Sequence, residues 1–431
     1  MSKTFCAYPW RHLYVQTTGH QKLCCQSNEH ITKNDGYHHF NLSRDSLIEA
    51  WNSDYMKNVR KKMLNNEKLS TCKRCYDLEA KGIKSMRISD NEEYYRSRTV
   101  DGVTDLSINH IELHFGNVCN LACKMCSQQY SHKIGEELLK MGAIDPDFLR
   151  WVKKESGVVN NWTGELDLVY DWFKNDRIKK EIFEIISSKV NNLSIVGGEP
   201  TAIPEFYELL EYCYQKDTLK NKSITLTTNL TNTNKNLLQW FNKIQAFNIY
   251  GSIDGIGKRN EYIRYPSKWN KILESLLFYQ DLINKVPAGK LVFGPTIQLL
   301  NIDHLTDMTV FFEQFAEKYK VDSTIWWTGV VTAPMIYDYQ IAPSDFKKYS
   351  IECLSEKINN IAKEENKKQV LSHITALQNS LSIQPNSNLL NAFIKFNDFQ
   401  DNYRKSTSWR TLLPELEKSL VSYTTGIKTI F

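Results

Sequence analysis

The chain has 431 residues, and its 41% hydrophobic, 12% aromatic and 24% charged content is that of a folded globular protein, which excludes a disordered, collagenous or coiled-coil chain. There is no uncharged apolar run of about 18 residues and no signal-peptide-like start, so we expect a cytoplasmic protein without a membrane segment. The net charge of +5 comes from 54 basic and 49 acidic residues scattered along the chain, and this does not indicate nucleic-acid binding.

Ten cysteines are the most informative part of the composition. In a reducing compartment disulfides are disfavoured, so clustered thiols are more often metal ligands or catalytic groups. Eight of the ten lie within the first 126 residues, in a dispersed N-terminal set and a tight set of three. The other two, Cys213 and Cys353, are expected to be core or surface thiols.

The first predicted element is a β-hairpin. Residues 10–16 and 21–24 flank a turn at Gly19, and its two ends would bring Cys6 and Cys24 together. Cys25 is the ambiguous neighbour, because adjacent side chains rarely bind one centre. Cys24 is preferred for its spacing from Gly19.

A helix is predicted next, capped near Asp45, and it leads to the pair Cys72 and Cys75. Its apolar residues recur at every fourth position: Leu47, Trp51, Tyr55, Val59 and Met63. Two thiols from the hairpin and two from the pair would supply four ligands. Four thiolates close a metal site, so this one should be structural or electron-transferring, and zinc or an iron-sulfur cluster would fit it equally well.

The tight set follows a predicted strand over residues 110–115, in which apolar and polar side chains alternate. Cys119, Cys123 and Cys126 lie within eight residues, so their thiolates can bind one face of an iron-sulfur cubane. A helix from about residue 127 to 141 is expected to come next.

No fourth cysteine follows the tight set closely, so a [4Fe–4S] cluster bound there would keep one iron open for a further ligand. The alternatives are a structural zinc site completed by His114 or His132, or three buried thiols without a metal.

The same unit of strand, loop and helix then repeats. This alternation predicts an α/β fold with a parallel sheet, a partial or full (β/α)6 barrel whose loops gather at the carboxyl ends of the strands. A doubly wound sheet is the alternative. The further strands are expected at residues 193–196, 224–228, 247–250, 291–300 and 323–327, and the main helices at 206–214, 235–244 and 271–282.

We expect three regions: an N-terminal domain over 1–105, the barrel over 106–343, and a mostly helical C-terminal region over 344–431 in which we find no catalytic motif. An insertion at about 142–190 carries Trp151, Trp162 and Trp172 and is expected to form a helical cover, although three tryptophans more often serve local packing.

The tight cysteine set resembles the CxxxCxxC loop of the radical S-adenosylmethionine (radical SAM) superfamily. Met125 stands where that family usually has an aromatic residue, and its apolar side chain can fill the same place beside the adenine. The resemblance implies that Cys119, Cys123 and Cys126 hold a catalytic [4Fe–4S] cluster that binds SAM.

Gly197-Gly198-Glu199-Pro200 resembles the family's GGEP segment. Glycines let the backbone approach a ligand closely, although a plain strand-to-helix turn is the alternative. The resemblance implies that this backbone and Glu199 meet the amino group of SAM. It also implies that Asn229, Ser252 and Asp254 point into the cleft, that Arg264 pairs with the SAM carboxylate, and that Gln298, on the fifth strand, is a weaker candidate.

The N-terminal pattern of Cys6, Cys24, Cys72 and Cys75 resembles the auxiliary-cluster (twitch/SPASM) domains of many radical SAM enzymes. The resemblance implies a second [4Fe–4S] cluster. These domains usually follow the barrel, whereas here the pattern comes first.

The resemblance implies an enzyme that reductively cleaves SAM to a 5′-deoxyadenosyl radical and abstracts hydrogen from a substrate, with a peptide as the first expectation and a small molecule as the other. An electron donor such as flavodoxin or ferredoxin is the implied partner. The alternative is a two-cluster electron carrier or scaffold that never cleaves SAM, but such a protein would need neither Gly197–Glu199 nor Arg264. A zinc protein that binds nucleic acid or protein is a third possibility, disfavoured by the weak basicity.

Overall fold

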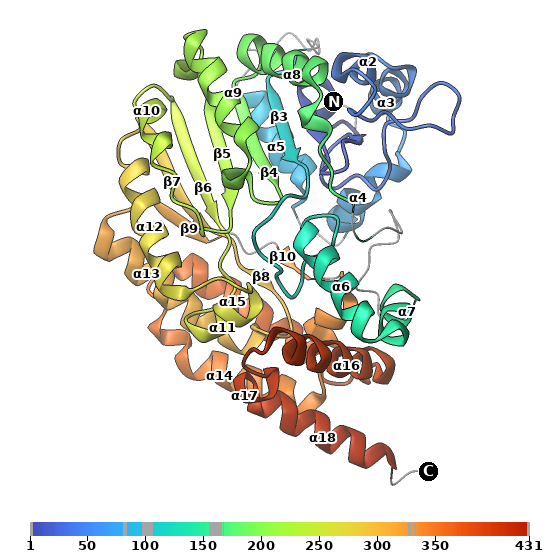
Figure 1. Ribbon diagram of the computed structural model, residues 1–431, viewed down its shortest axis with the longest axis vertical. Helices are drawn as coiled ribbons and strands as arrows, with labels where there is room; N and C mark the ends of the chain where they lie inside the picture. The colour runs from blue at the N-terminus through green and yellow to red at the C-terminus, as the bar shows by residue number, and fades with distance from the viewer. Residues whose placement is uncertain are drawn as a thin grey trace.

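A computed structural model describes residues 3–80, 84–96, 107–154, 166, 168–325, 329–331 and 333–428. Its centre is an eight-stranded sheet in the order β2-β1-β3-β4-β5-β6-β7-β9 (Figure 1). The strands are β1 (His12–Val15), β2 (Gln21–Lys22), β3 (His110–Phe115), β4 (Asn192–Gly197), β5 (Ser223–Thr228), β6 (Ala246–Gly251), β7 (Ala288–Phe293) and β9 (Ser323–Ile325).

Six strands, from β3 to β9, lie side by side in chain order and pair in parallel. A doubly wound sheet would reverse its strand order at a switch point, and this run has no reversal. The prediction of a partial (β/α)6 barrel is therefore confirmed, and the doubly wound alternative was wrong.

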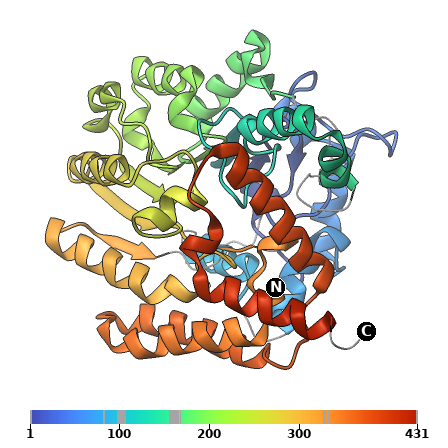
Figure 2. The same ribbon diagram turned by 60° about the horizontal axis from the view of Figure 1, so that its bottom comes forward.

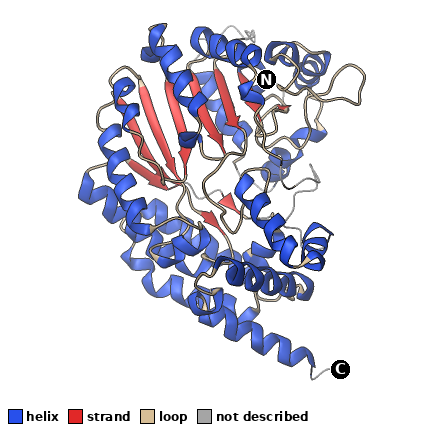
Figure 3. Ribbon diagram, viewed as in Figure 1, coloured by secondary structure: helices blue, strands red, loops and turns tan. Residues whose placement is uncertain are grey.

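Alternation of side chains explains which face of the sheet is buried. On β5, Ile224 and Leu226 are wholly buried, whereas Ser223, Thr225 and Thr227 between them are half-buried. The buried rows pack on outer helices, which flank one face of the sheet in Figure 3. These helices are α8 (Asp176–Lys189), α9 (Pro204–Gln215), α12 (Trp269–Ile283) and α13 (Leu305–Tyr319). The helix expected at 235–244 is only a short turn, η5 (Lys235–Leu237) followed by α10 (Leu238–Phe241).

The N-terminal hairpin joins this sheet. β1 and β2 pair antiparallel about Gly19, whose φ of +82° suits glycine, as predicted. β1 also pairs in parallel with β3, from His12 opposite His110 to Val15 opposite Leu113. The N-terminal segment is thus continuous with the barrel through backbone hydrogen bonds.

The single helix predicted from Asp45 to Met63 is two helices, α2 (Leu47–Trp51) and α3 (Asp54–Leu64). Ser46 caps the first in a capping box with Glu49. The side chain of Ser53 accepts the Met56 amide hydrogen and starts the second. This local cap interrupts an apolar pattern that otherwise runs on without a break. α4 (Lys73–Ala80) then carries Cys75, and α5 (Met86–Arg96) follows.

The insertion contributes α7 (Pro146–Lys154) beside α6 (His132–Ile144). Trp172 is buried and donates from Nε1 to the Thr17 carbonyl, which is a packing role, while Trp162 lies outside the described residues. A small second sheet pairs β8 (Thr296–Ile297) with β10 (Gly329–Val330).

The C-terminal region is helical, as predicted. Its helices are α14 (Ser344–Lys357), α15 (Glu364–Asn379), α16 (Ser387–Arg404), α17 (Trp409–Leu412) and α18 (Pro414–Lys428). Figure 2 shows α16 crossing close to α6, and Arg404 at its end bonds to Ala122 in the loop that carries the tight cysteine set. In the part of the chain that the structure describes, no helix is both long and apolar enough to cross a bilayer. The three region boundaries remain predictions.

Candidate functional site

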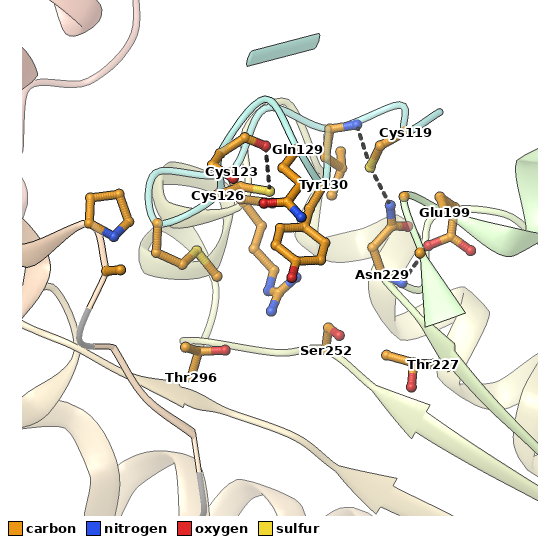
Figure 4. Close-up of a pocket in the computed structure, with 18 of the residues that line it drawn as sticks. Cys119, Cys123, Cys126, Gln129, Tyr130, Glu199, Thr227, Asn229, Ser252 and Thr296 are labelled. Carbon is orange, nitrogen blue, oxygen red and sulfur yellow. Dashed lines mark hydrogen bonds between the residues drawn. The ribbon is translucent and has the colours of Figure 1, made fainter. Parts of the chain in front are cut away.

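A cavity of about 1060 Å³ opens at the carboxyl ends of the parallel strands. Thr227, near the end of β5, and Ser252, directly after β6, line it opposite the cysteine loop (Figure 4). Ten of the eleven residues predicted at the catalytic site line this one cavity: Cys119, Cys123, Met125, Cys126, Gly197, Gly198, Glu199, Asn229, Ser252 and Arg264. The eleventh, Asp254, lies directly behind Arg264.

The three thiols of the tight set are close neighbours in a water-poor wall of the cavity. Cys119 and Cys123 are each 8% exposed. Burial raises the pKa of Cys119 to about 12, and the neighbouring Cys123 adds to this. Burial also raises the pKa of Cys126, with contributions from Cys123 and then Cys119. A bound cationic iron centre would stabilise all three as thiolates, which is the state that binds iron.

Neither histidine proposed for a zinc site joins these thiols. Nε2 of His114 lies 3.0 Å from Oε1 of Glu112, and Nδ1 of His132 accepts a hydrogen bond from the Cys119 amide at 3.2 Å. Among the described residues, no three His, Cys, Asp or Glu side chains converge as ligands of a single metal ion. A cluster spreads its ligands over several iron atoms, so the cysteine sets fit a cluster better than one zinc ion.

The glycine pair lies against the cysteine loop. Gly197 has a φ of +131°, which only glycine adopts without strain. A Cβ on Gly198 would lie 2.1 Å from the Val118 carbonyl oxygen, and the Glu199 amide donates to that oxygen at 2.8 Å. The glycines are therefore required by the approach of two backbone segments, and this places Gly198 and Glu199 at the same wall as Cys119.

Glu199 is 1% exposed, and its carboxylate accepts four hydrogen bonds. Oε1 accepts from the amide and hydroxyl of Thr201, at 3.1 and 2.6 Å, and from the Thr228 hydroxyl at 2.8 Å. Oε2 accepts from the Asn229 amide at 2.7 Å. Burial raises the pKa of Glu199, and these donors oppose the rise. The carboxylate thereby ties the end of β4 to the end of β5.

Asn229 turns its amide group toward the cysteine loop. Its Nδ2 donates to Oδ1 of Asn120 at 2.9 Å and lies 3.8 Å from Sγ of Cys119. Its Oδ1 accepts from the amide and hydroxyl of Thr231. Asn229 lines the cavity, but its side chain is held by protein partners.

Arg264 and Asp254 form a buried ion pair, with Nε 2.7 Å from Oδ2 and exposed fractions of 9% and 0% for the two side chains. Burial raises the pKa of Asp254, and the charge of Arg264 opposes this. The pair fixes the guanidinium at the cavity wall. Gln298 lies after β8, away from the fifth parallel strand, and is wholly buried with Nε2 bonded to the Thr296 carbonyl.

The four cysteines proposed as N-terminal ligands are also neighbours. Burial raises the pKa of Cys6, and the nearby thiols of Cys24 and Cys72 contribute. The pKa of Cys24 rises to about 11 through burial, with Cys75 among its neighbours. Cys25 turns elsewhere, because its Sγ lies 3.8 Å from Sδ of Met86 and accepts a hydrogen bond from Gln26. The arrangement therefore favours Cys24 as the fourth ligand.

Tyr130 lies between the two cysteine sets, and in Figure 4 it projects below Cys126 into the cavity. Burial raises its pKa, and the groups that contribute are Cys126 on one side and Glu112 and Cys25 on the other. Glu112, on β3, also contributes to the raised pKa of Cys24. Tyr130 thus interacts electrostatically with Cys126 of the tight set and with Cys25 of the N-terminal segment.

Sequence reasoning missed several residues at the site. Asn117 is wholly buried, and its side chain donates to the Gln128 and Leu168 carbonyls and accepts from the Tyr170 amide, which fastens the insertion to the cysteine loop. The threonines at 227 and 228 could have been found from their place before Asn229 at a strand end. No local pattern marked the others that line the cavity, which include Gln129, Tyr130, Lys153, Lys154, Thr296 and Met335.

Comparison with known proteins agrees with this geometry. A family model described as the radical SAM superfamily matches residues 113–298, and one described as an iron-sulfur cluster-binding domain (SPASM) matches residues 6–76. The cofactors implied by these domains are SAM, a [4Fe–4S] cluster and an additional cluster, as predicted. No curated protein matches the chain.

The solved structures that are similar include Streptococcus suis SuiB bound to S-adenosylmethionine, with 15% identity and a TM-score of 0.35 over 74% of this chain and 66% of that one. They also include anSMEcpe with bound AdoMet, with 16% identity and a TM-score of 0.32 over 57% of this chain and 59% of that one. SuiB bound to precursor peptide SuiA has 12% identity and a TM-score of 0.31 over 77% of this chain and 67% of that one. The chain thus spans about two thirds of the length of these solved chains or less.

Proposed function

From the radical SAM domain and the preceding SPASM domain that this chain carries, we propose that it is an enzyme that cleaves SAM reductively and abstracts hydrogen from a substrate. The observation that carries the proposal is that Cys119, Cys123 and Cys126 share one cavity with Gly198, Glu199 and Arg264. An electron carrier would need the thiols but no binding cavity beside them.

When bound, the cluster would supply one electron to the SAM sulfonium; the C–S bond then breaks to give methionine and a 5′-deoxyadenosyl radical, which takes a hydrogen atom from the substrate. The chain contributes orientation and shelter from water. Arg264, held by Asp254, offers a guanidinium to the SAM carboxylate. The backbone of Gly197 to Glu199 would offer its carbonyl groups to the amino group, and Met125 would lie beside the adenine.

The N-terminal set would hold the additional cluster through Cys6, Cys24, Cys72 and Cys75. Four thiolates leave no open coordination position, so this cluster would transfer electrons or stabilise the fold, and would not bind SAM.

The substrate we propose is a peptide or protein side chain, with a small molecule as the other class. The cavity of about 1060 Å³ is at the upper end of small-molecule pockets, which leaves room for more than SAM alone. SuiB, one of the similar solved structures, is bound to a precursor peptide in one case. An electron donor such as flavodoxin or ferredoxin would reduce the cluster.

The experiment is an anaerobic assay for 5′-deoxyadenosine with SAM and dithionite, comparing reconstituted wild type with Cys123→Ala and with Cys213→Ala. Cys213 is buried on α9, outside both cysteine sets, and so controls for the loss of a thiol. We expect product from the wild type and Cys213→Ala, and a loss of at least a hundredfold in Cys123→Ala.

Product formation by Cys123→Ala at the wild-type rate would refute the assignment of the SAM-binding cluster. If no protein forms product although both clusters are present, with candidate peptides added or omitted, the two-cluster electron carrier becomes the better account.

A further inference from the structure

The cysteine loop is held from outside by α16, a helix of the C-terminal region whose residues lie about 280 positions away in sequence. Nη2 of Arg404 donates to the Ala122 carbonyl at 2.6 Å. Nζ of Lys124 lies 2.7 Å from Oδ1 of Asp401. Ala122 and Lys124 are the two neighbours of Cys123, so α16 contacts the loop on both sides of that thiol.

These contacts are deeply buried. The Lys124 and Asp401 side chains are 0% and 5% exposed, and those of Arg404 and Glu137 are 1% and 8% exposed. Arg404 is also bonded to Glu137 of α6 through both carboxylate oxygens, at 2.6 and 2.7 Å. A buried bidentate guanidinium–carboxylate pair of this kind fixes the Arg404 side chain in one orientation.

Asp401 and Arg404 are each held by further contacts. Asp401 accepts from the Tyr262 hydroxyl at 3.0 Å and from the Trp409 amide at 2.8 Å. The Arg404 guanidinium lies 4.4 Å from the centre of the Tyr265 ring. Asp401 and Arg404 are three residues apart on one face of α16, so the helix presents both together.

We propose that Arg404 and Asp401 are positioning residues that fix the cysteine loop and set the electrostatic environment of its cluster. This inference deepens the proposed function and rests on it. Two basic side chains, Lys124 and Arg404, pair with two acidic ones, Asp401 and Glu137, beside the loop. Each electron added to a cluster there adds negative charge, so the charge balance of these side chains affects how easily the cluster is reduced.

The test is the reduction potential of the site cluster in the holoenzyme without SAM, followed by electron paramagnetic resonance during a redox titration. Arg404→Gln removes a cation, and Glu137→Gln removes its anionic partner while keeping a similar shape. We expect Arg404→Gln to make reduction at least tenfold harder, a fall of 59 mV for one electron, and Glu137→Gln to shift the potential in the opposite direction. The double variant should lie near the wild type.

Two controls accompany these variants. Arg410→Gln breaks the ion pair of Arg410 with Asp398, which lies on α16 but is about one-third exposed. The N-terminal cluster of the same molecule serves as an internal reference. In Arg410→Gln, and for the N-terminal cluster in every variant, the reduction equilibrium is not expected to change by more than twofold. A simple loss of packing would move both single variants the same way, so equal signs for Arg404→Gln and Glu137→Gln would overturn the proposal.

A second readout needs no cluster. In the apoprotein, we expect Cys123 to be alkylated at least tenfold faster in Arg404→Gln than in wild type, with Arg404→Lys restoring most of the protection and Arg410→Gln unchanged. If Arg404→Gln does not fold, the Glu137→Gln measurement decides the question, since an unchanged potential in that variant would overturn the proposal. Both readouts are separate from SAM cleavage, so a wild type that fails to cleave SAM would count against the proposed function alone.

Discussion

At the scale of single residues, Glu199 stands out because it is almost wholly excluded from water yet receives four protein hydrogen bonds. The Glu199 carboxylate holds Thr201, Thr228 and Asn229 in place, because it accepts hydrogen bonds from all three residues. The part of the binding site formed by Gly198 and Asn229 is therefore preorganised. A ligand that binds there loses less free energy to the ordering of these residues.

Glu199→Gln should test this role of the carboxylate. The amide has only one acceptor oxygen, so its NH₂ group would face donors, and a buried donor without an acceptor costs about 1–3 kcal/mol. We expect that loss of unfolding free energy in the apoprotein, measured with denaturant, and SAM binding about tenfold weaker by calorimetry. Glu205→Gln, at the half-exposed start of α9, is the control and should change neither quantity.

Gly198→Ala tests the approach of the glycine segment to the cysteine loop. The new Cβ would lie 2.1 Å from the Val118 carbonyl oxygen, so one backbone segment would have to move. Overpacking of this kind costs about 1–3 kcal/mol of unfolding free energy. Gly294→Ala is the matched control, because its nearest atom would be 3.8 Å away. Equal stability of the two variants in denaturant would contradict the assigned role of Gly198.

At the scale of elements, the N-terminal segment carries three packed histidine rings. The ring centres of His20 and His30 are 4.8 Å apart, and those of His30 and His39 are 5.1 Å apart. Burial lowers the pKa of His20 to about 4 and that of His30 to about 3, and the neighbouring histidines add to both effects.

These pKa values predict how stability depends on pH. An unfolded histidine titrates near pH 6.5, so between about pH 4 and 6.5 the unfolded chain binds more protons than the folded one. Stability should therefore fall as the pH decreases from about 6.5 toward 4. Burial also lowers the pKa of His12, His110 and His373, so His30→Gln, which keeps a donor for Gln16, should remove only roughly a fifth of this fall in the thermal midpoint. His38→Gln, at an exposed position nearby, should behave like the wild type; a His30→Gln slope equal to the wild-type slope would contradict the prediction.

The elements also show what a sequence can predict. The strand at His110–Phe115 was predicted with its observed bounds because alternation is a local signal. The break at Ser53 was missed because the apolar spacing continues across it, and only the cap marks it. The role of α16 was missed for a different reason: Arg404 meets Ala122 across 282 positions, and nothing near Arg404 distinguishes it from an exposed helical arginine.

The residues of the candidate site also divide into those that local sequence marks and those that only the tertiary structure brings to the cavity. Cys119, Cys123, Cys126, Gly198 and Glu199 were found because their spacing is itself a motif. Tyr130 lies in the cavity because of how the segment before α6 folds, and the lysines at 153 and 154 because of how the insertion packs; local sequence determines neither. The choice between Cys24 and Cys25 needed side-chain directions, which spacing from Gly19 only suggested.

At the scale of the whole molecule, the two cysteine sets lie in separate parts of the chain: the tight set follows β3, whereas the N-terminal set is spread from before α1 to α4. Cys72→Ala should therefore remove the N-terminal cluster and about half of the bound iron, while uncoupled 5′-deoxyadenosine formation continues at least in part. Iron analysis, electron paramagnetic resonance and the product assay measure these outcomes. Cys353→Ala, on α14, is the control. If Cys72→Ala gives no soluble protein, the N-terminal cluster is structural.

The parallel pairing of β1 with β3 also limits how this protein can be dissected. Residues 12–15 cover residues 110–113, so a fragment beginning near residue 106 would expose an edge strand with unpaired N–H and C=O groups. Such an edge recruits strands from other molecules, and we expect the isolated barrel to aggregate or to exchange strands with another copy. Co-expression with residues 1–105 should rescue it as a split protein, which size-exclusion chromatography would detect.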